Sequence, residues 1–173
     1  MKNVLVVVDM QNDFVDGSLG SLQAQAIVPE VVSLMQRQWD EICVTYDTHD
    51  TDYLSTHEGR YLPVEHCIKD TPGWQLNAEV QQALTSCENV RIFEKPTFGS
   101  QLLAQHLKEM NPDNIVICGL CTDICVISNA LLLRAALPET EITVKENACA
   151  GVSEDSHQAA LTIMKACHIK TEK

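Results

Sequence analysis

Three side chains in this sequence could together carry out nucleophilic chemistry. Asp9 ends a first apolar run, Lys95 follows a later one, and Cys125 follows the run Ile115–Cys118. Cys125 should fall in or near the first turn of a helix, where free backbone N–H groups favour an anion and a thiol tends to have a lowered pKa. Asp9 could accept the thiol proton and later deliver it to a leaving amine. Lys95 could lower the thiol pKa and keep Asp9 ionised.

The same turn offers a place for a developing negative charge. The backbone N–H groups of Cys121 and Cys125 lie around the expected helix start and could form an oxyanion hole. Each residue also has a simpler interpretation, since Asp9 could be a turn residue, Lys95 a surface charge and Cys125 a core thiol. All three nevertheless lie at the carboxyl ends of predicted parallel strands, where open α/β sheets place their sites. Their joint position favours a catalytic group.

A second constellation has the residue types of a metal site. Asp47 and His49 are two positions apart, so in extended backbone their side chains point the same way. His57, Glu58 and His66 follow in the same long loop. Mixed imidazole and carboxylate ligands suit Zn²⁺, Fe²⁺ or Mn²⁺. Asp-x-His alone is more simply a solvated loop, but a further His and an acidic residue between them indicate a metal site.

Two aromatic residues could contact a flat substrate. Phe14 follows shortly after the strand-end Asp9, and Trp74 lies near the end of the long loop. Aromatic rings in such positions can stack on a planar ligand. Each could equally be a loop anchor packed on the core, and the sequence leaves both interpretations open.

The eight cysteines are expected to be reduced thiols, because no export signal accompanies them. Cys43, Cys118 and Cys167 sit among apolar neighbours and are expected to be small buried hydrophobes. Cys118, Cys121 and Cys125 could also cradle a metal or an iron–sulfur cluster. Their spacing does not match the known cluster motifs, and Cys118 would lie inside a buried strand. We therefore set that interpretation aside.

Apolar runs alternate with helical patterns along the chain. Strands are predicted at Val4–Val8, Ile42–Tyr46, Val90–Phe93, Ile115–Cys118, Ile142–Val144 and His168–Lys170. Helices are predicted near Ile27–Trp39, Leu76–Ser86, Ser100–Met110, Asp123–Ala136 and Glu154–Ala166. Strands that are apolar on both faces and separated by helices indicate a parallel sheet covered by helices on both sides. The long irregular stretches, Gln11–Gln25 and Asp47–Gln75, are expected to be functional loops.

Length and charge limit the possible partners. The 173 residues predict a single domain, residues 1–173. With 24 acidic and 12 basic residues the net charge is −12 and no basic cluster stands out, which argues against binding to nucleic acid or an anionic membrane. The first apolar run is short and ends at Asp9, so it resembles a core strand and not a signal peptide. No run has transmembrane length, and we expect a cytoplasmic protein.

The catalytic motifs together resemble a known family. Val4-Leu-Val-Val-Val-Asp9-Met-Gln-Asn-Asp-Phe14, Glu94-Lys95-Pro and Gly119-Leu-Cys-Thr-Asp-Ile-Cys125-Val are similar to the isochorismatase-like cysteine hydrolases, the superfamily that contains nicotinamidases. The resemblance covers nearly the whole chain in the right order. It implies a catalytic triad of Asp9, Lys95 and Cys125, and a cis peptide at Leu120–Cys121 that aims the Cys121 N–H at an oxyanion. It also implies a three-layer α/β/α sandwich with a six-stranded, mostly parallel sheet.

The nicotinamidase-related branch of this family also implies a metal site. Its members carry an Asp-x-His and a later His-Cys, similar to Asp47-Thr-His49 and His66-Cys67 here. Some members add a Glu, and Glu58 has about that spacing; others use a His where this chain has Tyr53. The resemblance implies a divalent metal, Zn or alternatively Fe or Mn, that binds the pyridine nitrogen of the substrate.

The chain departs from that branch at two places in the long loop. Asp70 stands where the family usually has Gly before Thr, and Leu62-Pro-Val64 replaces a region in which the family often has Trp. That Trp helps to sandwich the nicotinamide ring. Its role would have to pass to Phe14, Phe98 or Trp74.

The expected function is therefore hydrolysis of a small carboxamide through a thioester on Cys125, with nicotinamide as the best single substrate. Another small amide or ureido compound remains an alternative, as does a non-catalytic binding domain or a thiol redox domain. Family members often form homo-oligomers, so a homo-oligomer is also expected.

Overall fold

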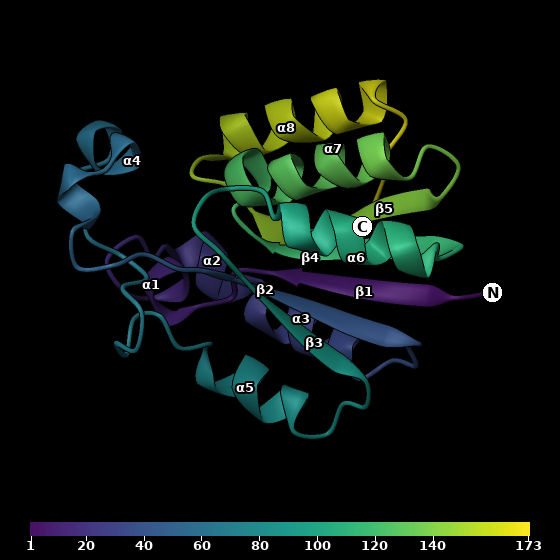
Figure 1. Ribbon diagram of the computed structural model, residues 1–173, viewed down its shortest axis with the longest axis horizontal. Coiled ribbons are helices and arrows are strands. Elements are labelled where there is room, and N and C mark those ends of the chain that lie inside the picture. Colours follow the sequence, from purple (N-terminus) through teal and green to yellow (C-terminus); the bar gives the residue numbers. More distant parts are fainter.

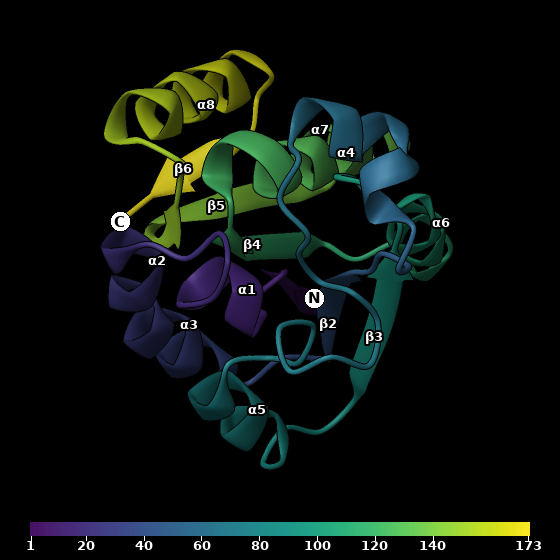
Figure 2. The ribbon, with the colours of Figure 1, turned by 90° about the vertical axis from the view of Figure 1, so that its left-hand side faces the viewer.

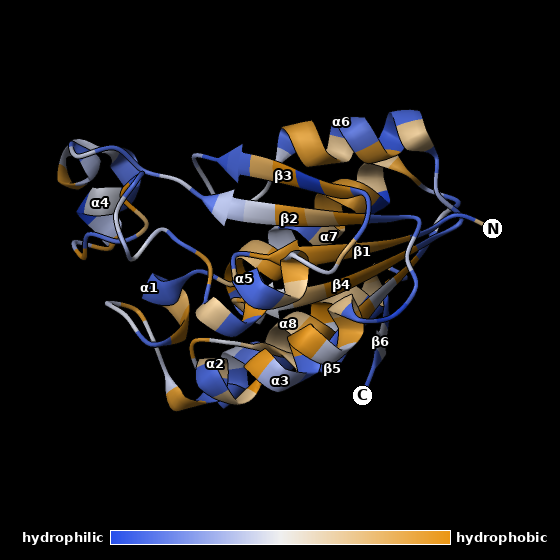
Figure 3. Cartoon of the chain, turned by 90° about the horizontal axis from the view of Figure 1, so that it is seen from below, coloured by the Kyte–Doolittle hydropathy of each residue, from blue (hydrophilic) through white to orange (hydrophobic).

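The apolar runs form one sheet in which every strand is parallel to its neighbours, as predicted. In the computed structural model, which describes residues 1–173, the strands pair in the order β3-β2-β1-β4-β5-β6. Their bounds are β1 Asn3–Val8, β2 Glu41–Asp47, β3 Val90–Lys95, β4 Asn114–Leu120, β5 Glu141–Ala150 and β6 Lys170–Glu172. The central strands β1 and β4 are apolar along their length because helices cover both faces (Figure 3).

The helices form two layers. On one face lie α6 (Gln101–Met110), α7 (Ile127–Ala136) and α8 (Glu154–Ala166). On the other face lie α1 (Asn12–Val15), α2 (Leu22–Ala26), α3 (Val28–Met35) and α5 (Ala78–Leu84). Figure 1 shows the two layers above and below the sheet. The result is the α/β/α sandwich that the sequence predicts.

The long loops gather beyond the carboxyl ends of the strands. A 3₁₀ turn, η1 (Tyr53–Ser55), and the short helix α4 (His57–Tyr61) lie within the loop after β2. Figures 1 and 2 show α4 projecting past the end of the sheet, on the side where β1 and β2 finish. The stretches expected to be irregular thus contain four short helical segments, α1, α2, η1 and α4. Ser21 and Thr56 cap α2 and α4 through their side-chain oxygens.

Side-chain caps explain several helix boundaries. Ser100 accepts the Leu103 N–H and starts α6, while Ser153 and Ser156 form a reciprocal capping box at the start of α8. The helix predicted to reach Trp39 ends earlier, at Met35. The Trp39 indole then folds back to donate to the Leu34 carbonyl at 2.8 Å.

Two expectations about individual residues were wrong. Cys167 is exposed, because it follows the last turn of α8 and does not point into the core. The strand predicted to end at Cys118, before Gly119, instead continues to Leu120, and Gly119 lies within it at φ +118°. No helix of the chain has both the length and the apolar character needed to span a membrane.

Gly119 lets β1 and β4 come together at the edge that carries the candidate site. A Cβ at this position would lie 2.1 Å from the Val8 carbonyl oxygen, which is backbone and cannot move aside. The next residue after Val8 is Asp9, which itself has a left-handed φ of 48°. A side chain at 119 would therefore disturb the position of Asp9 as well as the sheet.

Gly119→Ala should destabilise the fold by at least about 2 kcal/mol, because it adds a backbone clash to an unfavourable φ. Urea unfolding followed by circular dichroism measures this. The control is Gly99→Ala, whose Cβ meets mainly the flexible end of Leu132 and which should change stability by less than about 1 kcal/mol. Equal stability of the two variants would contradict the argument.

Candidate active site

The three candidate catalytic residues converge as predicted. Asp9 follows β1, Lys95 is the last residue of β3, and Cys125 lies in a π-helical turn, η2 (Thr122–Val126), between β4 and α7. The Lys95 Nζ lies 2.6 Å from Asp9 Oδ2 and 3.5 Å from the Cys125 Sγ. All three side chains are buried. A cation, a carboxylate and a thiol therefore meet in one water-poor place.

Burial sets the pKa of Asp9. Removal from water raises the pKa, and the nearby Lys95 ammonium opposes the rise. The Thr45 hydroxyl donates to Asp9 Oδ1 at 2.6 Å, which also favours the carboxylate. The net effect is a pKa for Asp9 above that of an exposed aspartate, so its carboxylate is a stronger base.

Lys95 keeps its charge in the core because anionic groups surround it. Burial alone would lower its pKa, but the Asp9 and Asp47 carboxylates raise it above the usual range. The Nζ also donates to the Thr97 carbonyl at 3.1 Å and lies 3.4 Å from Asp47 Oδ1. The ammonium therefore touches both Asp9 and the candidate metal cluster.

The expected lowering of the Cys125 pKa was wrong. Burial and the neighbouring Asp9 carboxylate raise this pKa well above its usual value, and Lys95 only partly offsets them. A helix start favours the thiolate, but removal of the sulfur from water outweighs that effect, and the Asp9 carboxylate adds to the rise in pKa. The resting group is a thiol with a base beside it.

The turn around Cys125 has an unusual backbone. The Leu120–Cys121 peptide is cis, as the family resemblance implied. The Ile124 and Val126 N–H groups both donate to the Cys121 carbonyl, and the Val126 bond has the π-helical spacing. The Thr122 hydroxyl and the His157 Nδ1 share a hydrogen bond of 2.7 Å, which connects the turn to α8.

The four residues of the candidate metal cluster also come together. Asp47, His49, Glu58 and His66 each offer an atom within 4.8 Å of the others. The His49 Nε2 lies 3.0 Å from Asp47 Oδ2, and the His66 Nε2 lies 3.4 Å from the same oxygen. Glu58 Oε1 completes the group, 3.7 Å from His49 Nε2 and 3.6 Å from His66 Nε2. His57, which shares this loop, instead packs on Tyr61 outside the cluster.

The donor set fits a divalent cation. The His66 Nδ1 faces the Val64 carbonyl at 2.8 Å, and because a carbonyl only accepts, this nitrogen carries the proton. The other ring nitrogen, Nε2, faces the cluster and would offer its lone pair to a bound cation, the arrangement that metal-binding histidines use. Two imidazoles and two carboxylates suit Zn²⁺, Fe²⁺ or Mn²⁺.

Both departures from the family pattern have a local explanation. Asp70 occupies the position of the usual glycine with φ 65°, a left-handed conformation that Asp adopts more readily than most residues. Val64, in the region that lacks Trp, holds His66 through a backbone carbonyl, so the side chain there is not needed for that contact. Tyr53 is fully buried and packs against the rings of both His49 and His66.

One cavity of about 490 Å³ opens onto the thiol and the metal cluster together. Cys121 and Cys125 line it on one side, and Asp47, Glu58 and His66 on another. Its apolar wall comes from the residues Phe14, Leu19, Leu62, Phe98, Leu120, Ile124 and Val152. This volume suits a small molecule held mainly by apolar contacts with a few polar groups.

The aromatic candidates divide between the cavity and the core. Phe14 lines the cavity beside His66, with 5.5 Å between ring centroids, and Phe98 lies at its rim with 42% of its surface exposed. Trp74 does not reach the cavity. It packs on Tyr46 and its indole donates to the Thr48 hydroxyl at 2.9 Å, so it is a loop anchor.

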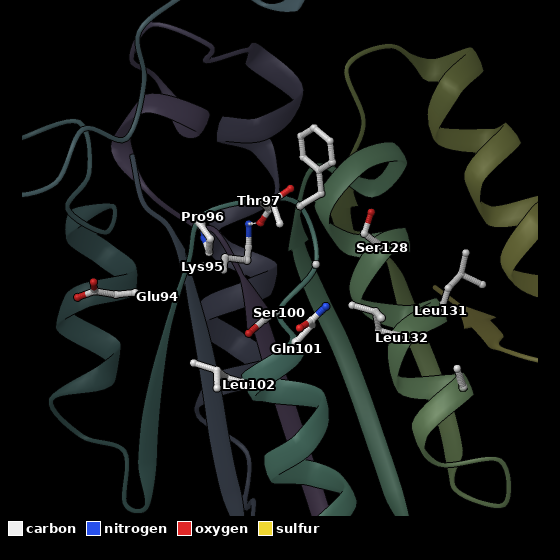
Figure 4. Close-up of a pocket in the computed structure, with 13 residues that line it drawn as sticks. Glu94, Lys95, Pro96, Thr97, Ser100, Gln101, Leu102, Ser128, Leu131 and Leu132 are labelled. Atoms are coloured by element: carbon white, nitrogen blue, oxygen red, sulfur yellow. Dashed lines mark hydrogen bonds between the residues drawn. The ribbon is translucent and has the colours of Figure 1, made fainter. Parts of the chain in front are cut away.

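A larger groove lies beside the site without holding its chemistry. It has a volume of about 800 Å³ and runs between the β3–α6 loop and α7 (Figure 4). Figure 4 shows Lys95 at its edge with the hydrogen bond to Thr97. Lys95 is only 1% exposed, so the groove borders the site but gives no open access to the ammonium.

Several positioning residues were missed from the sequence. Thr45 supports Asp9, and Gln11 holds Asp47 by accepting its N–H at 2.7 Å and donating to its carbonyl at 2.8 Å. Asp13 accepts the Cys67 N–H at 2.7 Å, next to His66. Asn129 donates to the Cys125 carbonyl and accepts from the Ser100 N–H. The available signal was a polar side chain inside an apolar run, as at Thr45.

The chain is similar in sequence and in fold to known proteins. The chain is 29% identical to the isochorismatase family protein PncA of Bacillus subtilis, over 94% of this chain and 93% of that protein. It superposes on the crystal structure of the nicotinamidase/pyrazinamidase PncA from Bacillus subtilis with a TM-score of 0.88 and 27% identity, covering 100% of both chains. The pyrazinamidase of Pyrococcus horikoshii, solved in complex with zinc, gives a TM-score of 0.82 at 25% identity, covering 100% of this chain and 99% of that one.

The family assignment rests on nearly the full length of the chain. The isochorismatase domain matches residues 3–172. That span includes all six strands and every residue of the thiol cluster and the metal cluster. The chain belongs to the isochorismatase family, in its nicotinamidase-related branch.

Proposed function

We propose that this protein hydrolyses nicotinamide to nicotinate and ammonia, with Cys125 as nucleophile. The observation that carries the proposal is the single cavity lined by both the Cys125 thiol and three members of the candidate metal cluster. A thiol and a candidate metal cluster that line the same cavity suit a planar ring with a carboxamide. The relatives named nicotinamidase or pyrazinamidase support the same substrate class.

The first half of the reaction uses the thiol and its base. Asp9 takes the Cys125 proton as the sulfur attacks the amide carbonyl, and Lys95 balances the negative charge that the pair shares. The carbonyl oxygen becomes an oxyanion, which the backbone N–H groups of Cys121 and Cys125 stabilise. Asp9 then gives its proton to the amide nitrogen. The C–N bond breaks, ammonia leaves, and a thioester remains on Cys125.

The second half restores the thiol. Asp9 takes a proton from a water molecule, whose oxygen attacks the thioester carbonyl. The C–S bond breaks, the acid product leaves, and the proton returns from Asp9 to the sulfur. A raised pKa suits Asp9 to this exchange, because it must accept and release a proton in each half.

The metal cluster would set the orientation of the substrate. Asp47, His49, Glu58 and His66 would hold a divalent cation, with zinc the leading choice, and that cation would bind the pyridine nitrogen. Phe14 packs beside His66 and Phe98 lies at the rim, so these rings would contact the faces of the substrate. The carboxamide would then point towards Cys125.

The direct test is ammonia release from a panel of small amides. Nicotinamide and pyrazinamide should be turned over, and benzamide, which lacks the ring nitrogen, should be a much poorer substrate. No ammonia from any panel member would overturn the proposal. Faster turnover of an aliphatic or ureido compound would replace nicotinamide with that substrate class.

Cys125→Ala should lower kcat/KM for nicotinamide by at least about 10⁴-fold while the circular dichroism spectrum stays unchanged. The matched control is Cys121→Ala, which keeps the backbone N–H and should remain active. Retained activity in Cys125→Ala would end the thioester mechanism.

The acid limb of the pH profile should report Asp9. The base must be ionised, so kcat/KM falls as the pH drops through the Asp9 pKa. Thr45→Val removes a hydrogen bond that favours the carboxylate, which should raise that pKa further and move the acid limb to higher pH. Thr48→Val, which alters a hydroxyl outside this contact, should leave the limb in place. The profiles are measured as kcat/KM against pH, and an unmoved limb in Thr45→Val would contradict the role of Asp9.

Removal of metal by a chelator should abolish most nicotinamide hydrolysis, and added Zn²⁺ should restore it. Metal content and ammonia release are measured on the same samples. His49→Asn should lose the metal of this cluster together with activity, and added Zn²⁺ should not restore the activity. Full activity in metal-free protein would contradict the orienting role of the cation.

A further inference from the structure

A second group of metal-ligating residues lies at the other end of β2. Glu41 begins this strand, Cys43 follows two positions later on the same face, and His106 comes from α6. Their ligand atoms all lie within 4.8 Å of one another. At about 3.3 Å per residue, Cys43 lies roughly 13 Å along the strand from Asp47. This group is therefore separate from the catalytic cavity.

The three side chains already point at one place. Glu41 Oε1 lies 2.5 Å from the His106 Nε2 and 3.3 Å from the Cys43 Sγ. The ligands of a tetrahedral zinc ion are separated by roughly 3.4–3.6 Å, given the usual zinc bond lengths. The Cys43–Glu41 separation is already close to this value, and the Glu41–His106 contact would have to open by about 1 Å to reach it.

Burial and charge at this place also suit a cation. Cys43 is fully buried, while the Glu41 and His106 side chains are 14% and 22% exposed, which leaves a path from solvent. Burial raises the pKa of the Cys43 thiol, and the adjacent Glu41 carboxylate adds to that effect. Without an ion the thiol stays protonated beside a carboxylate. A divalent cation would neutralise one thiolate and one carboxylate together.

One positive group competes for the same carboxylate. The Arg91 Nε lies 3.7 Å from Glu41 Oε1, but its side chain is 56% exposed and can swing into water. Phe93 packs on the His106 ring with 5.5 Å between centroids, which limits the rotation of the imidazole. The ligands from the strand and the helix are thus held more firmly than the competing cation.

We propose that Glu41, Cys43 and His106 form a second zinc-binding site, with a water molecule as fourth ligand. The ligand set of one thiolate, one imidazole and one carboxylate selects a thiophilic divalent ion and excludes Mg²⁺ and Ca²⁺. The ion would join β2 to α6 on the face of the sheet opposite α3 and α5. Its role would be structural, because it lies away from the reacting groups.

The test is metal binding to the full-length protein. The chain is stripped with a chelator under reducing conditions, reloaded with Zn²⁺ and freed of excess ion, and zinc per chain is measured by elemental analysis. Cys43→Ser and His106→Gln should each bind one zinc fewer per chain than the wild type. Cys87→Ser, which changes a partly buried thiol without such neighbours, should bind the same amount as the wild type.

Cobalt provides a readout that the catalytic cluster cannot give. Co²⁺ bound by a thiolate absorbs in the near ultraviolet through sulfur-to-metal charge transfer, and the catalytic metal cluster contains no cysteine. The band should appear in wild type, Cys125→Ala and His49→Asn, and disappear in Cys43→Ser. Zinc should also raise the Tm of His49→Asn but not that of His49→Asn combined with Cys43→Ser.

The outcomes separate this proposal from the proposed function. Equal zinc content in wild type and Cys43→Ser, or a cobalt band that survives in Cys43→Ser, would overturn the second site. Loss of one zinc in Cys43→Ser with unchanged nicotinamide hydrolysis would support it. Failure of His49→Asn to lose zinc would count against the proposed catalytic metal instead. It would not change the difference in zinc content between wild type and Cys43→Ser.

Discussion

The buried ammonium of Lys95 is the interaction on which the rest of the site depends. It lies 2.6 Å from Asp9 Oδ2, 3.4 Å from Asp47 Oδ1 and 3.5 Å from the Cys125 Sγ. An isolated charge buried in such a place would cost several kcal/mol. The Lys95 ammonium and the carboxylates of Asp9 and Asp47 therefore depend on one another to stay charged in the core. The lysine thereby links the thiol chemistry to the metal cluster. Because Asp9 lies against both the ammonium and the thiol, the proton on Cys125 has a destination a short distance away.

The fold brings these groups together through the sheet. Three neighbouring strands, β3, β2 and β1, carry Lys95, Asp47 and Asp9 at their ends, in that order. The Cys125 turn follows β4, on the other side of β1. Parallel strands end at the same edge, so residues far apart in sequence meet there without long connections. Gly119 allows β4 to lie against Val8, which places the turn next to Asp9. The candidate catalytic group therefore lies at the end of the buried central strands.

The positions of Asp9, Lys95 and Asp47 at one edge of the sheet could be predicted, because a polar residue that ends an apolar run is visible in the sequence. The pKa of Cys125 could not be predicted, because it depends on the burial of the thiol and on how closely Asp9 and Lys95 approach it in the folded chain. Trp74 was ambiguous for a similar reason, since only the packed loop shows that its indole turns to Thr48. The Glu41, Cys43 and His106 cluster needs α6 docked on the sheet, and no local pattern reports that docking.

The division between strands and loops explains where this chain can differ from its relatives. The candidate catalytic groups are fixed by strand ends and by the turn before α7, whereas the cavity wall comes largely from loops. Both departures from the family pattern, at Asp70 and at Leu62-Pro-Val64, lie in the loop after β2. The backbone absorbs them, because Asp70 takes the left-handed conformation and the Val64 carbonyl still orients His66. A change in the wall, such as Leu62 facing the cavity, can therefore alter which ring fits while Asp9, Lys95 and Cys125 keep their geometry.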